Sequence, residues 1–163
     1  MANAHDFTFH KLAAQDSDDI ALKAFAGKAI LVVNVASACG YTPQYRELES
    51  LYEARAKDGL VVLGVPCNDF GRQESKDEGD IKSFCESAYH VTFPMTGKVS
   101  IVGAERHPFY RWIALEAGES ALPRWNFHKF LIGKDGALIE GFPSNAAPLG
   151  REMMAAIDAA LSA

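Results

Sequence analysis

Two stretches of the chain are apolar at nearly every position, and both predict buried strands. Residues 29–36 have the sequence Ala-Ile-Leu-Val-Val-Asn-Val-Ala, and residues 60–65 have the sequence Leu-Val-Val-Leu-Gly-Val. Apolar, β-branched residues on both alternating faces are typical of a strand covered on both sides, so we expect 29–36 to be a central strand. The intervening segment leaves room for a helical crossover, which predicts a parallel βαβ unit.

A helix should follow the first of these strands. Thr42 offers a side chain that can cap a helix N-terminus, and Pro43 suits the first helical position. We therefore expect the helix to begin near Thr42, with an apolar stripe formed by Leu48, Leu51 and Tyr52.

Further helices are predicted over residues 80–89, over residues 108–117 and near the C-terminus. Apolar residues recur at i, i+3, i+4 and i+7 in the segment 80–89, which places Cys85 on its buried face. The apolar sets are Ile81, Phe84, Cys85 and Ala88 in this segment, and Met153, Ile157 and Leu161 in the C-terminal helix.

Short alternating segments predict two strand pairs. Residues 7–10 and 20–22, separated by a polar stretch, suggest a hairpin at the edge of the sheet, whereas 127–132 and 137–142 suggest an antiparallel hairpin with its turn at 134–136. The order of elements predicts the α/β class. We expect a thioredoxin-like fold, in which a mixed β-sheet with an N-terminal β-hairpin is flanked by α-helices.

Length and composition favour a single domain over residues 1–163. Hydrophobic residues make up 48% of the chain and charged residues 23%, which is typical of a soluble protein with a buried hydrophobic core. The net charge of −5, without a run of Lys and Arg, argues against a nucleic-acid partner. We expect no membrane span, because the apolar run 29–33 is far shorter than the roughly 18 residues required. The absence of a signal-like N-terminus predicts a cytoplasmic protein.

One of the cysteines lies in the predicted strand-to-helix turn and is a candidate reactive thiol. The chain has 3 cysteines, Cys39, Cys67 and Cys85, and this odd number without CxxC spacing fits neither a disulfide framework nor a zinc site. Cys39 comes just before the predicted helix, whose unpaired N–H groups and positive dipole end favour a thiolate. The alternative is a small buried residue in a tight turn, which the turn sequence alone leaves open.

Three separated motifs carry a resemblance to a known family. They are residues 34–42 (Asn-Val-Ala-Ser-Ala-Cys-Gly-Tyr-Thr), 66–74 (Pro-Cys-Asn-Asp-Phe-Gly-Arg-Gln-Glu) and 125–127 (Trp-Asn-Phe). In this order they resemble the glutathione peroxidase family, in particular its cysteine-containing, thioredoxin-dependent bacterial type. The resemblance extends from about residue 27 to the C-terminal helix.

The resemblance implies a catalytic role for Cys39, as the peroxide-reducing cysteine, supported by Gln73, Trp125 and Asn126. The two amides and the indole each offer an N–H donor that can stabilise charge as a thiolate attacks an O–O bond. Taken singly, the tryptophan would more often be a packing residue, and the amides would more often be turn residues.

The second motif departs from the usual family pattern at two positions. Asp69 stands where Gln or Asn is common, and Ser75 follows Glu74 where Pro is common. We expect these changes to affect the rate more than the reaction, because Gln73 is retained.

The implied function is that of a thiol peroxidase that reduces hydrogen peroxide and organic hydroperoxides, with an antioxidant role under oxidative stress. Cys39 would form a sulfenic acid, which Cys85 would resolve as an intramolecular disulfide. The segment 84–94 resembles the stretch that holds the resolving cysteine in thioredoxin-dependent members. Reaching Cys39 would require the helix 80–89 to open, because a disulfide needs Cα atoms within about 7 Å. Cys67 is expected to be structural, and packing alone is the alternative for Cys85.

Thioredoxin or a small thiol such as glutathione would then recycle the enzyme. The alternative function is a redox sensor or relay that transfers the oxidation of Cys39 to a partner protein. A cysteine hydrolase using Cys39, His128 and Asn126 would need a spatial triad that the sequence does not specify. We expect no cofactor and no metal, because the sequence lacks phosphate-loop, dinucleotide and metal-ligand spacings.

Overall fold

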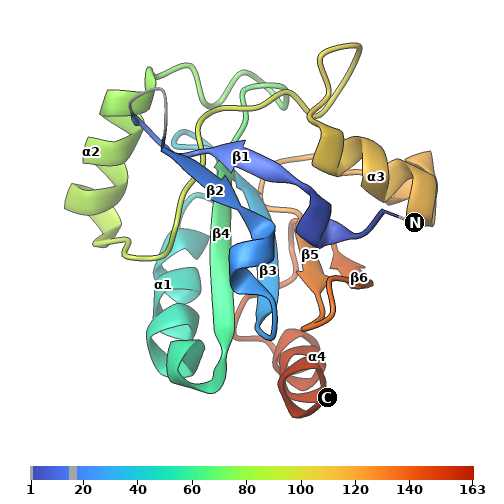
Figure 1. Cartoon of the computed structure of the whole chain (residues 1–163). Coiled ribbons are helices and arrows are strands. Elements are labelled where there is room, and N and C mark those ends of the chain that lie inside the picture. The colour runs from blue at the N-terminus through green and yellow to red at the C-terminus, as the bar shows by residue number, and fades with distance from the viewer. Residues whose placement is uncertain (1, 15–17) are drawn as a thin grey trace.

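A four-stranded mixed sheet forms the centre of the computed structural model, which describes residues 2–14 and 18–163 (Figure 1). Its strand order is β4-β3-β5-β6, and β3 pairs parallel with β4 and antiparallel with β5. Every residue of β3 and β4 is buried, as the apolar runs predicted. The strands are β3 (Ala29–Val35), β4 (Leu60–Pro66), β5 (Lys129–Ile132) and β6 (Leu138–Phe142).

Helices cover both faces of the sheet. The helices α1 (Gln44–Arg55), α2 (Glu78–Tyr89) and α4 (Arg151–Ser162) contribute to the core on one face. The helix α3 (Pro108–Ala117) packs on the other face. Alternate residues of β3 point to the two cores, because side chains of a strand alternate between faces. This arrangement confirms the predicted mixed sheet flanked by helices.

The N-terminal strand pair is present, but its predicted place at the sheet edge is wrong. The strands β1 (Thr8–His10) and β2 (Asp19–Ala21) pair antiparallel in a two-stranded sheet of their own. The reason is packing: Phe9 is buried, and its ring stacks on His107 beside α3 at a centroid distance of 4.0 Å. Part of the predicted polar turn, residues 15–17, lies outside the described residues.

Short 3-10 turns connect several elements. They are η1 (Ala4–Asp6), η2 (Leu22–Phe25), η3 (Ala56–Asp58) and η4 (Glu119–Ala121).

Three local expectations differ from the structure. The helix α1 begins at Gln44, and Thr42 does not cap it, because the Thr42 hydroxyl bonds within the preceding turn. Ala88 is exposed, and Tyr89 packs against the core in its place. The strand predicted from 127 begins at 129, because Phe127 has a φ of 64°, which is incompatible with an extended strand.

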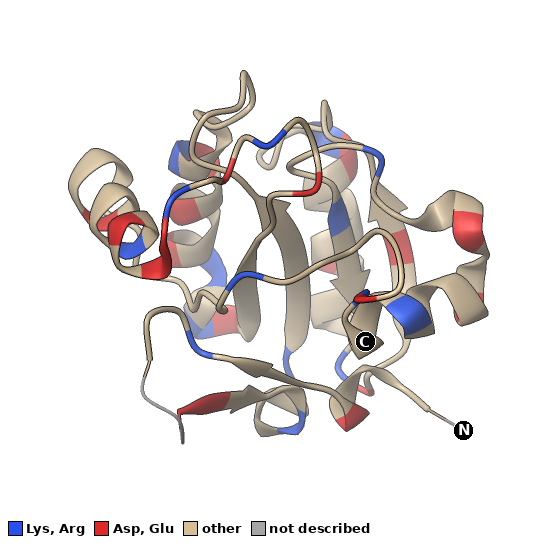
Figure 2. Cartoon of the chain, turned by 90° about the horizontal axis from the view of Figure 1, so that it is seen from above, with Lys and Arg blue, Asp and Glu red and all other residues tan. Residues whose placement is uncertain are grey.

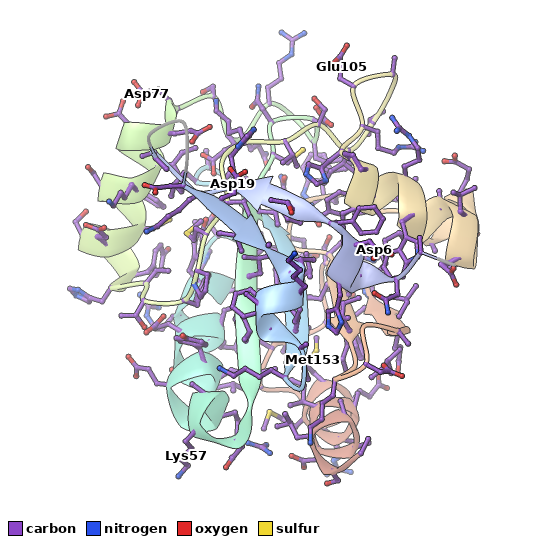
Figure 3. The ribbon with its side chains drawn as sticks, viewed as in Figure 1. Asp6, Asp19, Lys57, Asp77, Glu105 and Met153 are labelled. Carbon is purple, nitrogen blue, oxygen red and sulfur yellow. The ribbon has the colours of Figure 1, made fainter. Side chains whose placement is uncertain are left out.

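Charged residues of both signs are distributed over the helices and loops (Figure 2). Lys57, Asp77 and Glu105 are exposed and project from the periphery (Figure 3). In residues 2–14 and 18–163, no helix has the length and apolar character needed to cross a membrane.

Candidate active site

Cys39 lies in the turn that joins β3 to α1, and its backbone is fixed on both sides. Its N–H donates to the Thr42 hydroxyl at 2.9 Å, and the Thr42 N–H donates to the Cys39 carbonyl at 3.0 Å. The Thr42 hydroxyl also donates to the Ala36 carbonyl at 2.8 Å. Thr42 therefore organises the cysteine turn rather than the helix terminus.

A backbone N–H is directed at the cysteine sulfur. The Tyr41 N–H donates to Cys39 Sγ at 3.3 Å, and Cys39 is 8% exposed. The turn enters the N-terminus of α1, where further N–H groups and the positive end of the helix dipole lie. The sulfur therefore accepts one backbone hydrogen bond in the turn that leads into α1, and a small part of Cys39 reaches the surface.

The second motif is attached directly to this turn. The Ala38 N–H donates to the Gln73 carbonyl at 3.0 Å, so the residue before Cys39 is held against the 66–74 loop. The Gln73 side-chain oxygen accepts from Asn126 Nδ2 at 2.9 Å, and the same nitrogen donates to the Phe70 carbonyl at 3.2 Å. Gln73 and Asn126 are thus brought together beside the cysteine turn.

Trp125 is 36% exposed and packs over Gly71. A Cβ atom at Gly71 would lie 2.5 Å from Cη2 of the indole, which explains the need for glycine at this position, where φ is +69°. The ring is therefore seated on the loop that carries Gln73. The structure brings all four sequence-predicted residues of the Cys39 site to the loops around this end of the sheet.

The sequence analysis did not identify Asn34 as a residue that positions this site. Its side-chain N–H donates to the Trp125 carbonyl at 3.0 Å, and its backbone carbonyl accepts from the Phe127 N–H at 2.6 Å. Asn34 thereby connects β3 to the Trp-Asn-Phe segment. A buried asparagine within an otherwise apolar strand was the signal that could have revealed it, because buried polar groups require partners.

An open pocket of about 450 Å³ adjoins Trp125. It includes Tyr41, whose N–H contacts the Cys39 sulfur, and the cation of Arg124. The lining side chains are aromatic, aliphatic, polar and positively charged: Tyr41, Ser120, Leu122, Arg124, Trp125, His128, Pro143, Ser144 and Asn145.

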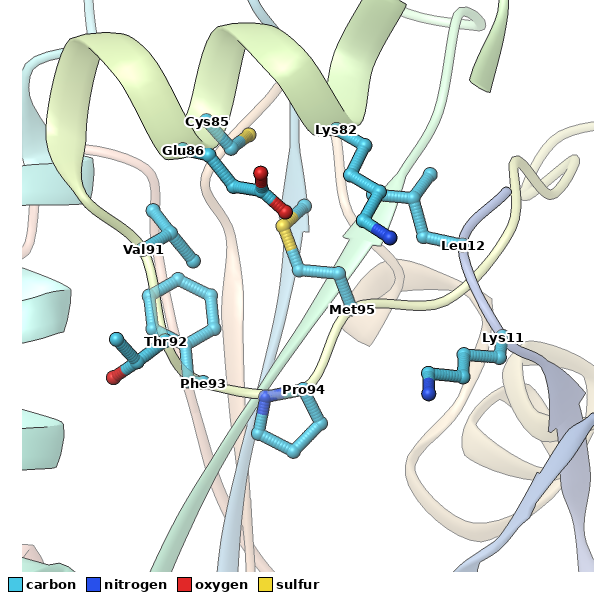
Figure 4. A pocket seen from close by; sticks show the side chains of 10 residues that line it. All are labelled: Lys11, Leu12, Lys82, Cys85, Glu86, Val91, Thr92, Phe93, Pro94 and Met95. Carbon is cyan, nitrogen blue, oxygen red and sulfur yellow. The ribbon is translucent and has the colours of Figure 1, made fainter. Parts of the chain in front are cut away.

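Cys85 is buried in α2, with 2% exposure, and the structure does not join it to Cys39. Burial raises the pKa of its thiol to about 11, with a smaller lowering effect from Tyr45 and raising effects from Glu74 and Glu86. Cys85 lines a pocket of about 230 Å³ between α2 and residues 91–95 (Figure 4). The thiol is therefore protonated in the closed helix at neutral pH.

Cys67 is fully buried just after β4, and burial raises its pKa to about 12. A protonated, inaccessible thiol is a poor nucleophile, which is consistent with the structural role expected for this residue.

The two unusual positions of the second motif have different surroundings. Asp69 Oδ2 accepts the N–H groups of Ile101 and Val102 at 2.6 and 2.9 Å, so it anchors the 101–102 loop. Ser75 is exposed.

The structure gives no support to the hydrolase alternative. Burial lowers the pKa of His128 to about 4, and within the described part of the chain its buried Nε2 has no hydrogen-bond partner. It therefore makes no nucleophile–base contact with Cys39. The described residues also contain no group of three His, Cys, Asp or Glu side chains that could hold a metal ion.

Comparisons with known proteins agree on one family. The family model for glutathione peroxidase matches residues 7–114. The chain is 37% identical to the thioredoxin/glutathione peroxidase BtuE of Escherichia coli, over 90% of this chain and 92% of that protein. It is 42% identical to the hydroperoxy fatty acid reductase gpx1 of Synechocystis sp., over 83% and 85%.

Solved structures show the same fold. The apo crystal structure of Trgpx matches with a TM-score of 0.77 and 38% identity, over 99% of this chain and 97% of that chain. A putative thiol:disulfide interchange protein DsbE from Chlorobium tepidum matches with a TM-score of 0.68 at 17% identity, over 98% and 95%, which shows the thioredoxin-like fold alone.

Proposed function

The chain belongs to the glutathione peroxidase family, and on this premise we propose that Cys39 is the thiol with which it reduces hydroperoxides. The protein is a thiol peroxidase, an oxidoreductase. The observation that carries the assignment to Cys39 is the Tyr41 N–H directed at its sulfur in a turn attached to Gln73.

In the proposed reaction the Cys39 thiolate attacks the nearer oxygen of the O–O bond. An S–O bond forms to the terminal, protonated oxygen and the O–O bond breaks, which leaves a sulfenic acid on Cys39. The departing oxygen takes up a proton from solvent and leaves as an alcohol, or as water when the substrate is hydrogen peroxide. The amide N–H of Gln73 and the indole N–H of Trp125 stabilise the charge that moves to the departing oxygen. Asn126, whose amide nitrogen already donates to Gln73 Oε1 and to the Phe70 carbonyl, positions Gln73 for this role. The hydrogen bond between Gln73 and Asn126 keeps both amides in position before peroxide arrives.

The second step of the proposal is resolution by Cys85. Its sulfur replaces the hydroxyl of the sulfenic acid, which gives a Cys39–Cys85 disulfide and water. Since Cys85 is buried in α2, the helix must open locally to let the two sulfurs meet. Thioredoxin then reduces the disulfide by thiol exchange, and glutathione is the other candidate reductant. Dependence on a thiol reductant suits a reducing compartment such as the cytoplasm.

We propose that the substrates include organic hydroperoxides as well as hydrogen peroxide. The pocket beside Trp125 offers apolar area from Tyr41 and Leu122, and the guanidinium of Arg124 could meet an anionic group. A relative with the printed name hydroperoxy fatty acid reductase supports the same substrate class. The peroxidase names of the relatives do not favour the sensor or relay alternative.

The test is peroxide-dependent NADPH consumption, coupled through thioredoxin and thioredoxin reductase or through glutathione and glutathione reductase. We expect Cys39→Ser to abolish turnover while the fold remains intact, because a hydroxyl is far less nucleophilic than a thiolate at neutral pH. Cys67→Ser is the matched control and should retain turnover. Activity in Cys39→Ser would refute the assignment, and a single stoichiometric oxidation of the parent without turnover would instead support the relay.

A further inference from the structure

A lysine is completely buried in the central sheet. Lys129, the first residue of β5, has 0% exposure. Leu131, two residues further along the strand, belongs to the core on the face covered by α1, α2 and α4, so the Lys129 side chain enters that face as well. Lysine is almost never fully buried unless its amine has partners that replace water. The partners of this amine therefore indicate what the residue does.

The Lys129 amine holds the segment that connects β6 to α4. Its Nζ donates to the Ser144 carbonyl at 3.0 Å and to the Ala146 carbonyl at 2.7 Å. Both carbonyls belong to a turn that is closed by the Ala146 N–H, which donates to the Pro143 carbonyl at 2.9 Å. One buried amine thus fixes two carbonyls of the turn 143–146.

The first residue of α1 holds the same turn. Gln44 Nε2 donates to the Ser144 carbonyl at 2.8 Å, and the Gln44 backbone N–H donates to the Tyr41 carbonyl at 2.8 Å. Tyr41 is the residue whose N–H donates to the Cys39 sulfur. Gln44 therefore connects the turn 143–146 to the cysteine turn through two hydrogen bonds.

The turn 143–146 forms part of the wall of the pocket beside Trp125. Residues 143–145 line this pocket of about 450 Å³, together with Tyr41. An organic hydroperoxide that enters the pocket carries a group that the wall must accommodate, whereas hydrogen peroxide carries none. The position of the wall therefore acts on the two kinds of substrate differently.

We propose that Lys129 is a positioning residue that sets the preference for organic hydroperoxides by holding the turn 143–146 as a fixed wall of the pocket beside Trp125. This inference rests on the proposed function, in which Cys39 reduces hydroperoxides that enter this pocket. Lys129 contacts no reacting atom. Its amine holds the wall, and the wall orients the organic group so that the peroxide oxygen meets the Cys39 sulfur in a reactive geometry.

A purely structural role for the lysine makes a different prediction. Loss of the amine would then disturb the fold or the whole site, and it would slow the reaction with every peroxide. A positioning role predicts a loss that is large for organic hydroperoxides and small for hydrogen peroxide. The ratio of the two rate constants, measured on one variant, separates the two roles.

The experiment measures oxidation of Cys39 in the reduced protein by two peroxides. Stopped-flow measurements give the second-order rate constants for hydrogen peroxide and for cumene hydroperoxide, an uncharged aromatic hydroperoxide. Lys129→Met removes the amine and keeps an unbranched side chain that can fill the core. We expect this variant to lower the rate constant for cumene hydroperoxide by roughly 10–100-fold and that for hydrogen peroxide by less than about threefold.

A second variant tests the wall without changing the sheet. Gln44→Ala removes the other side-chain donor to the Ser144 carbonyl. We expect it to lower the rate constant for cumene hydroperoxide, relative to that for hydrogen peroxide, by roughly 2–10-fold, the scale of one hydrogen bond. Should Lys129→Met not fold, Gln44→Ala decides the question by the same ratio.

Lys134→Met is the matched control. The Lys134 amine also donates to two backbone carbonyls, those of Leu161 at 2.7 Å and Ala163 at 3.1 Å, but these lie at the end of α4 and not in the pocket wall. This variant should keep the parental ratio of the two rate constants.

The ratio of the rate constants decides the outcome. A parental ratio in Gln44→Ala and in folded Lys129→Met, which includes equal losses with both peroxides, would overturn the inference. Failure of both peroxides to oxidise Cys39 in the parent would instead overturn the proposed function.

Discussion

A hydrogen bond between the side chains of Gln73 and Asn126 holds the two amides in a fixed relative position. Asn126 is fully buried and donates both to Gln73 and to the Phe70 carbonyl, so its orientation is determined by the fold. Because Asn126 holds the Gln73 side-chain oxygen, the Gln73 amide N–H is in place before the reaction and needs no reorganisation as charge develops on the peroxide oxygen.

Removing either amide should therefore slow peroxide attack. We expect Asn126→Ala and Gln73→Ala each to lower the second-order rate constant for oxidation of Cys39 by roughly 10–1000-fold, because the first releases the positioned donor and the second removes it. The double variant should lose less than the product of the two effects, because both changes break the same hydrogen bond. Stopped-flow measurement of thiol oxidation tests this, and parental rates in both single variants would contradict it.

His128 makes stability depend on pH. Its pKa is lowered to about 4 by burial and by the nearby charge of Lys129. Since the unfolded histidine has a pKa near 6.5, the unfolded state binds more protons between about pH 4 and 6.5, and stability falls as pH is lowered through this window.

We accordingly expect His128→Gln to show a smaller loss of unfolding free energy between pH 6.5 and 4.5 than the parent. Urea unfolding at several pH values measures the difference. Glu74, whose pKa is raised, acts in the opposite direction, and comparison of variant with parent removes its contribution. Identical pH dependence in the two proteins would show that the pKa of His128 is the same in the folded and unfolded states.

At the scale of elements, α2 is the part of the fold that the proposed mechanism requires to move. Only Ile81 and Cys85 of this helix are fully buried, and it ends at His90 in a left-handed conformation with φ 53°. Its N-terminus depends on Asp77, whose side chain accepts from the Asp80 N–H at 2.8 Å. Its first turn is also held by the Glu78 side chain, which accepts the N–H groups of Ala13 and Lys98 at 2.9 and 3.1 Å. The buried face of α2 is narrow, and its opening breaks these bonds but none of the central sheet.

Loss of that cap should favour opening. An N-cap contributes ~0.5–2 kcal/mol, so we expect Asp77→Ala to lower the hydrogen-exchange protection of α2 amides by roughly 2–30-fold and to speed formation of the Cys39–Cys85 disulfide. Asp80→Ala is the matched control, because it removes a carboxylate from the same helical turn but no cap bond that the structure shows. Equal protection in parent and Asp77→Ala would contradict the dependence on the cap.

The elements that could be predicted from the sequence are those whose pattern is local. The bounds of α3 are those predicted, 108–117, because Pro108 and Gly118 mark its ends and its apolar residues repeat at helical spacing. Thr42 shows the limit of such reasoning. It is a good capping residue, but the turn around Cys39 takes up its hydroxyl, and competition of this kind is not visible in the local sequence.

For the whole molecule, the sequence predicted the mixed sheet and its helical layers better than the contacts between its loops. The burial of β3 and β4 follows from continuous apolar runs. The links from Asn34 to Trp125 and from Asn126 to Gln73 join residues far apart in the chain, and no periodicity encodes them. The burial of the Glu74 carboxyl could not be predicted either, because a glutamate after a glutamine in a polar loop is expected to be solvated.

The separation of Cys39 and Cys85 on different elements has a consequence for the mechanism. Cys39 and Cys85 lie in the same core cluster, but on different elements, and both are free thiols in this structure. The account therefore requires two states of the molecule, a closed reduced state and an oxidised state in which α2 has opened. The central claim is that oxidation by peroxide converts the first state into the second.

Peptide mapping after oxidation with one equivalent of peroxide tests that claim most directly. We predict an intramolecular Cys39–Cys85 disulfide, accompanied by loss of hydrogen-exchange protection in α2, and a sulfenic acid that persists on Cys39 in Cys85→Ser. Recovery of a Cys39–Cys67 disulfide instead, or undiminished thioredoxin-coupled turnover in Cys85→Ser, would contradict the two-cysteine mechanism.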